Sequence, residues 1–228
     1  MSERLRDPSV RERVKKEFNA DIPGWENFIK LIGWENILIN SVPSGKNKVF
    51  EGRTLAEIGR LEGKDPADAA FDLIVEEDGD IGIILFNIMS EDDIERLMGQ
   101  EFSMFGSDGL YVLPGARPHP RLYGTFPRIL GEYVRRRGVI PLEEAVRKMT
   151  SLPAQRLGLA QKGLIKEGMD ADIVIFDKDE IEDRATYQDP CRYPNGVYYV
   201  IVNGEVVVEN GKHTGKRPGK LLRRVKAR

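Results

Sequence analysis

The sequence contains very few cysteines and histidines, the residues that most often bind zinc and, for cysteine, cross-link chains. Its 228 residues include one cysteine, Cys191, and two histidines, His119 and His213. A single thiol excludes an internal disulfide and favours a reducing, cytoplasmic compartment. A catalytic zinc usually takes three protein ligands placed together, so we expect no complete zinc site within this chain and interpret Cys191 as an ordinary thiol.

Long apolar runs and an excess of one charge sign are also missing. No segment approaches the ~20 apolar residues that span a bilayer, and the first residues, MSERLRDPSV, lack the apolar core of a signal peptide. Lys and Arg number 35 against 37 Asp and Glu, so the net charge of -2 predicts neither a nucleic-acid nor a membrane partner. The basic tail, residues 212–228, has no interleaved aromatic residues, which favours a solvated segment over an RNA-binding one.

Short apolar segments alternate with helical patterns in the first two thirds of the chain. Residues 36–42, 81–89 and 102–106 are predicted strands, and IGIILFNIM at 81–89 is apolar enough for a strand covered on both faces. Such alternation predicts parallel strands joined by right-handed crossovers, as in a doubly wound sheet or an α/β barrel.

Helix starts are marked by capping residues. Asp7-Pro8 and Asp65-Pro66 each place a capping side chain before a proline at the first helical position. Thr54 and Glu57 have the spacing of a capping box. Further helices are predicted over residues 126–137, 141–149 and 153–157.

The pattern changes near residue 163. Residues 164–166, 171–176 and 198–208 are strand-like, and Asn203-Gly204 between two apolar runs predicts a type I′ hairpin. We therefore expect an α/β domain over residues 1–162 and a small antiparallel β unit with a basic tail over 163–228.

The best catalytic candidate is Asp108, within the sequence GSDG at the end of the third predicted strand. Functional residues of parallel α/β folds lie at such strand ends, although Ser-Asp-Gly is also ordinary turn chemistry. The sequence RPHPR follows with Arg117, His119 and Arg121, either a Pro-rich surface loop or an anion-binding loop in which an arginine binds a carboxylate. A Ser-His-Asp triad is disfavoured, because Ser107 lacks the G-x-S-x-G elbow.

Several motifs together resemble one family. FGSDG followed by HPRLYGTFPRILGEYV is similar to a distinctive pair in the D-aminoacylase, or N-acyl-D-amino-acid deacylase, family of the amidohydrolase superfamily. The segments EGRTLAEIG, PLEEAVRKMTSLPAQRLGL, KGLIKEGMDADIVIFD and IVNGEVVVENGKHTGKRPG also resemble that family. The resemblance covers nearly the whole chain.

The resemblance implies a fold and a chemistry. The fold would be the C-terminal portion of an amidohydrolase-type (β/α)8 (TIM) barrel, about three βα units, followed by a small antiparallel β unit. The chemistry would be zinc-dependent hydrolysis of N-acyl-D-amino acids to a carboxylate and a D-amino acid. Asp108 would move the proton and Arg121 would bind the substrate carboxylate, with His119 and Ser107 as further substrate-binding candidates.

The chain departs from the family in one respect. The family's histidine and cysteine metal ligands should precede the first residue of this chain, so the zinc ligands are expected outside it. We therefore expect either the C-terminal portion of a deacylase, completed by an N-terminal barrel half or by self-association, or an inactive remnant or non-catalytic scaffold subunit that lacks the metal site.

Overall fold

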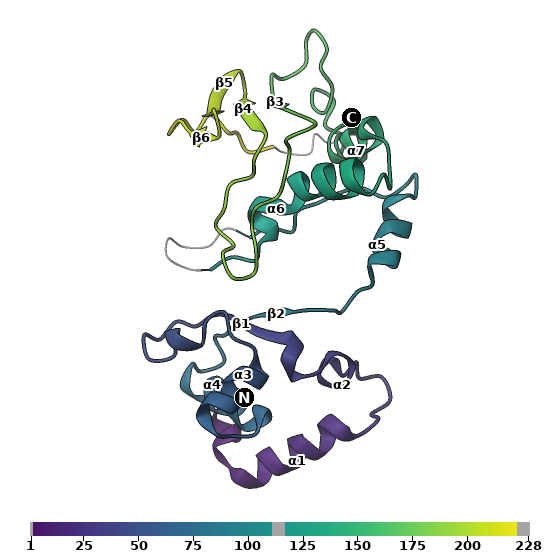
Figure 1. Ribbon diagram of the computed structural model, residues 1–228. Helices are drawn as coiled ribbons and strands as arrows, with labels where there is room; N and C mark the ends of the chain where they lie inside the picture. Colours follow the sequence, from purple (N-terminus) through teal and green to yellow (C-terminus); the bar gives the residue numbers. More distant parts are fainter. Residues whose placement is uncertain (1, 111–116, 223–228) are drawn as a thin grey trace, which may run out of the picture. The chain divides into compact units, whose positions relative to one another are not determined.

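The protein is described by a computed structural model that covers residues 2–110 and 117–222 (Figure 1). It forms two compact units, Met1–Ser90 with Val112–His119 and Glu91–Tyr111 with Pro120–Arg228. Each unit contains both helices and strands, so the α/β class is confirmed. None of the helices within the described ranges has the length and apolar character needed to cross a membrane.

The first unit consists of short helices around a two-stranded sheet. Its elements, in chain order, are η1 (Ser2–Arg6), α1 (Pro8–Asn19), α2 (Phe28–Ile32), η2 (Trp34–Asn36), β1 (Ile37–Ser41), η3 (Lys48–Phe50), α3 (Leu55–Glu62), α4 (Pro66–Glu76) and β2 (Gly82–Leu85).

The local helix signals of this unit are confirmed. The side chain of Asp7 accepts from the N–H of Ser9 at the start of α1, and that of Asp65 accepts from Ala67 at the start of α4. Thr54 forms the predicted capping box with its partner at the third helical position of α3. These signals act within one turn of the chain, which is why the sequence alone identifies them.

The predicted strand direction is wrong. Strands β1 and β2 pair antiparallel, with Ile37 opposite Leu85 and Leu38 opposite Ile84. Two helices, α3 and α4, separate the strands and are joined by a short turn. The chain reverses direction at α3 and again at α4, so it returns to the end of the sheet where β1 finished, and β2 then runs antiparallel to β1. A single crossover helix would instead give parallel strands.

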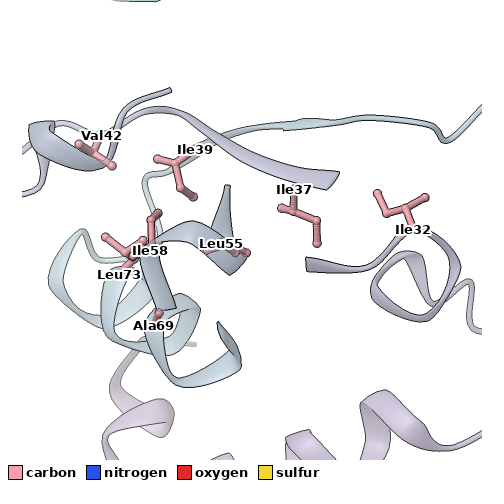
Figure 2. Packing of buried hydrophobic residues seen from close by; sticks show 8 residues of the cluster. All are labelled: Ile32, Ile37, Ile39, Val42, Leu55, Ile58, Ala69 and Leu73. Carbon is pink, nitrogen blue, oxygen red and sulfur yellow. The ribbon is translucent and has the colours of Figure 1, made fainter. Parts of the chain in front are cut away.

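The core of the first unit lies between β1 and the two helices. Figure 2 shows eight buried side chains that form this cluster: Ile32, Ile37, Ile39, Val42, Leu55, Ile58, Ala69 and Leu73. Strand β2 is shorter than predicted, and Ile83 is 54% exposed whereas Ile84 is 5% exposed. The expectation of a strand covered on both faces is therefore wrong, because Ile83, which lies opposite the buried Ile39, is left largely exposed on that face.

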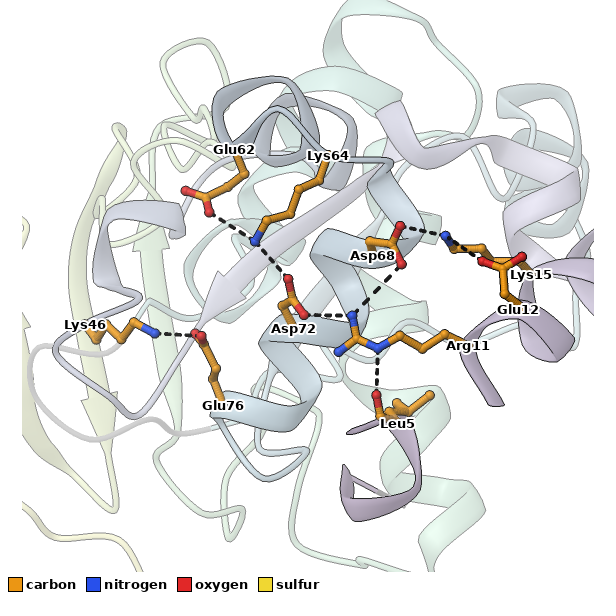
Figure 3. A network of polar contacts seen from close by, with 10 residues as sticks. All are labelled: Leu5, Arg11, Glu12, Lys15, Lys46, Glu62, Lys64, Asp68, Asp72 and Glu76. Atoms are coloured by element: carbon orange, nitrogen blue, oxygen red, sulfur yellow. Dashed lines mark hydrogen bonds and ion pairs between the residues drawn. The ribbon is translucent and has the colours of Figure 1, made fainter. Parts of the chain in front are cut away.

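Ion pairs connect α1, the α3–α4 turn and α4 (Figure 3). Arg11 Nη1 lies 2.8 Å from Asp72 Oδ1, and Lys15 Nζ lies 2.6 Å from Asp68 Oδ2. Lys64 Nζ is 2.8 Å from Asp72 Oδ2. One carboxylate thus bridges cations from two different segments of the chain.

The second unit combines a helical layer with a four-stranded antiparallel sheet of order β3-β4-β5-β6. Its elements are α5 (Glu91–Met98), α6 (Arg121–Arg128), the π-helix η4 (Ile129–Arg136), α7 (Leu142–Met149), α8 (Ser151–Leu157), β3 (Ile173–Phe176), β4 (Val197–Val202), β5 (Glu205–Glu209) and β6 (Lys212–His213).

The hairpin prediction is confirmed. Asn203 and Gly204 have positive φ angles of 48° and 81° between β4 and β5, as a type I′ turn requires. The predicted strand at 164–166 is wrong. Gly163 and Gly168 adopt φ angles of 86° and 82°, which turn the chain on both sides of this segment, and Ile165 is 87% exposed.

The third predicted strand, residues 102–106, also does not form. The chain here follows an irregular path along α7, and the N–H of Phe105 donates to the carbonyl of Lys148 at 3.1 Å. Polar groups of the preceding turn bind the side chain of the same lysine. Ser103 and Phe105 therefore bond to Lys148 of α7 rather than to a neighbouring strand, which apolar periodicity does not reveal.

Candidate active site

The candidate site lies in the second unit, where the irregular segment 103–110 meets the start of α6. Asp108 has a φ angle of 46°, in the left-handed region where Asp is among the few non-glycine residues found with any frequency. Its side chain is 77% exposed. A residue held in this conformation depends on the contacts around it, and such residues often occur at functional sites.

Arg121, the first residue of α6, provides the cation of the site. Its Nη2 atom lies 2.7 Å from Asp108 Oδ2. An exposed ion pair contributes little to stability because water screens it. What matters is where the ion pair places its two groups. The guanidinium of Arg121 can bind the carboxylate of a ligand with two parallel hydrogen bonds, and the carboxylate of Asp108 lies directly beside it.

The segment around Asp108 packs against the first turn of α6. The Oγ atom of Ser107 accepts from the N–H of Gly109 at 3.2 Å, and the hydroxyl of Thr125 donates to the carbonyls of Arg121 at 2.9 Å and Ser107 at 3.5 Å. A Cβ on Gly109 would lie only 3.0 Å from the Cα of Leu122, so the glycine permits this close approach.

Three of the four predicted site residues belong to the same unit. Ser107, Asp108 and Arg121 belong to the second unit, whereas His119 is the last residue of the first unit. Arg117 belongs to the first unit as well, and its carbonyl accepts from Asn40 Nδ2 at 2.5 Å.

Lys148 in α7 is a buried residue that sequence reasoning missed. Its side chain is 1% exposed, and its ammonium donates to the carbonyls of Met98 and Gln100 and to Ser103 Oγ. Burial lowers the pKa of the Lys148 ammonium, and Glu144 opposes that shift. The available signal is its spacing from Leu142 and Ala145, which places a lysine on the apolar face of the helix.

A second missed residue is Asp183, which lies against α6. Its carboxylate accepts from the N–H of Ala185 at 2.8 Å. A Cβ on Gly124 would lie 2.3 Å from Asp183 Oδ1, so the glycine makes room for the carboxylate on the helix surface. Burial raises the pKa of Asp183 above its ordinary value. The sequence around Gly124 does not indicate that Asp183 contacts it, because the two residues are far apart along the chain.

Metal-binding groups do not gather at this site. Within residues 2–110 and 117–222, no three His, Cys, Asp or Glu side chains are placed to hold a metal ion together. His213 Nδ1 accepts from the N–H of Gly215 at 2.9 Å, and Cys191 is an exposed thiol. The described residues do not by themselves fit a three-ligand zinc centre.

The chain belongs to the amidohydrolase family, whose model matches residues 45–208. It is 43% identical over 178 residues to a D-aminoacylase from Alcaligenes xylosoxydans xylosoxydans, covering 78% of this chain and 35% of the relative. It is 44% identical over 174 residues to an N-acyl-D-glutamate deacylase of the same organism, covering 76% and 34%. The resemblance inferred from GSDG and HPRLYGTFPR is confirmed.

Solved structures agree with this assignment. An N-acyl-D-glutamate deacylase from Bordetella bronchiseptica, solved with zinc and a phosphonate that mimics the tetrahedral intermediate, is 40% identical with a TM-score of 0.67, over 76% of this chain and 34% of that one. A D-aminoacylase studied for its binuclear metal center is 41% identical with a TM-score of 0.67, over 79% and 36%. The family thus implies zinc, and the chain spans about a third of the length of these relatives.

Proposed function

We propose that this chain supplies the proton-transfer and carboxylate-binding groups of an enzyme that hydrolyses N-acyl-D-amino acids. The observation that carries the proposal is the 2.7 Å contact between Arg121 and Asp108. It puts a group able to bind the α-carboxylate of an N-acyl amino acid beside a group able to accept a proton. The relatives named above act on substrates of this class.

The two residues have distinct roles in the proposed reaction. Arg121 binds the substrate carboxylate, which replaces Asp108 on the guanidinium and fixes the orientation of the amide. Asp108 then accepts a proton from the attacking water and delivers it to the leaving nitrogen as the C–N bond breaks. The products are a carboxylic acid and a free D-amino acid, so atoms and protons balance.

The remainder of the site is proposed to come from outside this chain. Zinc is the cofactor that the family implies, and we propose that its ligands belong to the earlier part of an amidohydrolase barrel, present as a separate subunit or as preceding sequence. The C-terminal portion of a (β/α)8 barrel with a small β unit is the architecture that fits this proposal. A scaffold subunit that only binds anions through Arg121 is the outcome to be distinguished by experiment.

The test is reconstitution with the part of a D-aminoacylase that lies outside the matched region. Co-expression should give a complex that hydrolyses N-acetyl-D-amino acids, with the L-enantiomers as a control for specificity, whereas the chain alone should neither bind zinc nor turn over substrate. In the complex, Asp108→Asn should lower kcat by ~100-fold or more while the zinc content stays unchanged.

A matched variant controls for the loss of one negative charge. Asp179 lies in the same unit and its side chain is 73% exposed beside Lys178, so Asp179→Asn should leave kcat unchanged. Full turnover in Asp108→Asn would remove Asp108 from the mechanism. A stable complex that binds N-acyl amino acids without turnover would favour the scaffold.

A further inference from the structure

The buried ammonium of Lys148 is surrounded mainly by neutral oxygen atoms. It lies 2.6 Å from the carbonyl of Met98 and 2.9 Å from Ser103 Oγ, and it also donates to the carbonyl of Gln100. A carboxylate oxygen of Glu144 is more distant, at 3.8 Å. Three donors thus meet three acceptors from one short segment, as an ammonium without water requires.

Lys148 also contacts Phe105, through its backbone carbonyl and through its ammonium group. Its carbonyl accepts from the N–H of Phe105 at 3.1 Å, and its ammonium lies 6.0 Å from the centre of the Phe105 ring. Phe105 also packs on the buried cluster that includes Tyr133 and Ile140. The chain from Met98 to Phe105 is therefore bound to one residue of α7.

The site begins directly after this bound segment. Only Gly106 and Ser107 separate Phe105 from Asp108, and Asp108 holds a left-handed backbone conformation. On either side of Asp108 the segment lies against α6: the carbonyl of Ser107 accepts from the hydroxyl of Thr125 at 3.5 Å, and Gly109 lies close to Leu122. Without a strand ladder over residues 102–106, these two attachments define the path of the chain into and out of Asp108.

We propose that Lys148 is a positioning residue for Asp108, holding the 98–105 segment so that the carboxylate is presented next to Arg121. The expected effect of Lys148 on turnover rests on the proposed function. The expected effect of Lys148 on the conformation of residues 103–110 does not depend on any activity. Small displacements of a proton-transfer group lower the rate strongly, so a residue that touches no substrate can still control kcat.

The experiment compares Lys148→Met with Lys64→Met in the full chain. Methionine keeps most of the length and apolar volume of lysine but has no N–H donors. Lys64 is a matched lysine of the first unit that is 38% exposed and pairs with Asp72. Hydrogen exchange of amides in residues 103–110 should become about 10-fold faster in Lys148→Met, with α8 and the first unit unchanged, and should not change in Lys64→Met.

Turnover provides the second readout. In the reconstituted complex, Lys148→Met should lower kcat about 10-fold or more with KM within about 2-fold, because the carboxylate-binding arginine stays in place on α6. Lys148→Arg should recover part of kcat. Ser103→Ala, which removes one acceptor and leaves the core intact, should speed exchange of the same segment by about 3-fold and decides the question if Lys148→Met does not fold.

Three results would overturn the proposal. Unchanged exchange of residues 103–110, or exchange that rises equally across α6, α8 and the segment, would give Lys148 a general structural role only. Faster exchange of the segment with wild-type kcat would show that its position does not matter to the reaction. Full turnover in Asp108→Asn would instead contradict the proposed function, and the exchange data would still stand.

Discussion

The two units use charged side chains in different ways. In the first unit, Arg11 and Lys15 on α1 and Lys64 in the α3–α4 turn are 20%, 25% and 38% exposed, and each faces a carboxylate (Figure 3). In the second unit, Lys148 is 1% exposed and faces carbonyls. Exposed pairs contribute about 0–1 kcal/mol each, whereas an uncompensated buried charge costs several times more. We therefore expect the buried Lys148, more than the ion pairs of the first unit, to control the local path of the chain.

The largest expected effect comes from truncating the buried lysine. Lys148→Ala leaves a cavity and removes the donors to Met98 and Ser103, so the second unit should lose about 3 kcal/mol of stability. Lys64→Ala should cost the first unit about 0.5 kcal/mol. Hydrogen exchange of α7 and α8 amides in rising denaturant measures the first value. Equal losses of stability in the two variants would show that the buried lysine contributes no more than the exposed one.

A buried carboxylate of the first unit, Glu77, extends the comparison between buried and exposed charges. Glu77 is 5% exposed and accepts from the N–H of Ser44 at 2.9 Å and from Asn47 Nδ2 at 2.6 Å. Burial alone would raise the pKa of Glu77, but the hydrogen bonds from Ser44 and Asn47 outweigh burial and hold the pKa below its ordinary value of 4.5.

The sign of the pH dependence follows from that direction. The carboxylate binds protons less readily in the folded than in the unfolded chain, so its contribution is complete above pH 4.5 and is lost as the pH falls through the lowered folded pKa. Glu77→Gln should therefore cost about 1–2 kcal/mol at pH 7 and less at pH 3. Fluorescence of Trp25 and Trp34, the two tryptophans of the chain, reports the unfolding of this unit. An equal cost at both pH values would show that the charge of Glu77 is not involved.

The smallest effect is expected on the exposed network. Burial by itself would raise the pKa of Asp72. Hydrogen bonds from Lys64 and Arg11 outweigh burial, so the pKa of Asp72 lies below its ordinary value. Asp72→Asn should cost about 0.5–1 kcal/mol at low salt, measured by the same fluorescence, and about half of that in 1 M salt, because ions screen partly exposed pairs. A cost that salt does not change would place Asp72 with the buried groups.

Local rules predicted the fold better than its long-range contacts. The cap at Asp7, the capping box at Thr54 and the turn at Asn203-Gly204 each depend on neighbouring residues, and all three are confirmed. The antiparallel pairing of β1 and β2 depends on how α3 packs on α4, which periodicity does not specify. Within residues 102–106, Ser103 and Phe105 bond to Lys148, more than 40 positions away.

The candidate site was predictable to a similar extent. GSDG and HPR identified Asp108 and Arg121, which the structure places in contact. The same motifs suggested His119, which lies in the other unit. Lys148 and Asp183 were not predicted, because a buried lysine and a carboxylate seated on a glycine are defined by contacts between distant segments. Whether Asp108 and Arg121 act on substrate stays a prediction.

The most direct test of the account is the carboxylate preference of Arg121→Lys in the reconstituted complex. The quantity to measure is the ratio of kcat/KM for an N-acetyl-D-amino acid to that for its uncharged carboxamide. Lysine keeps the charge but cannot form the two parallel hydrogen bonds of a guanidinium, so the ratio should fall by about 10-fold or more, chiefly through KM. A ratio equal to that of the wild type would contradict the assignment of Arg121 as the group that binds the substrate carboxylate.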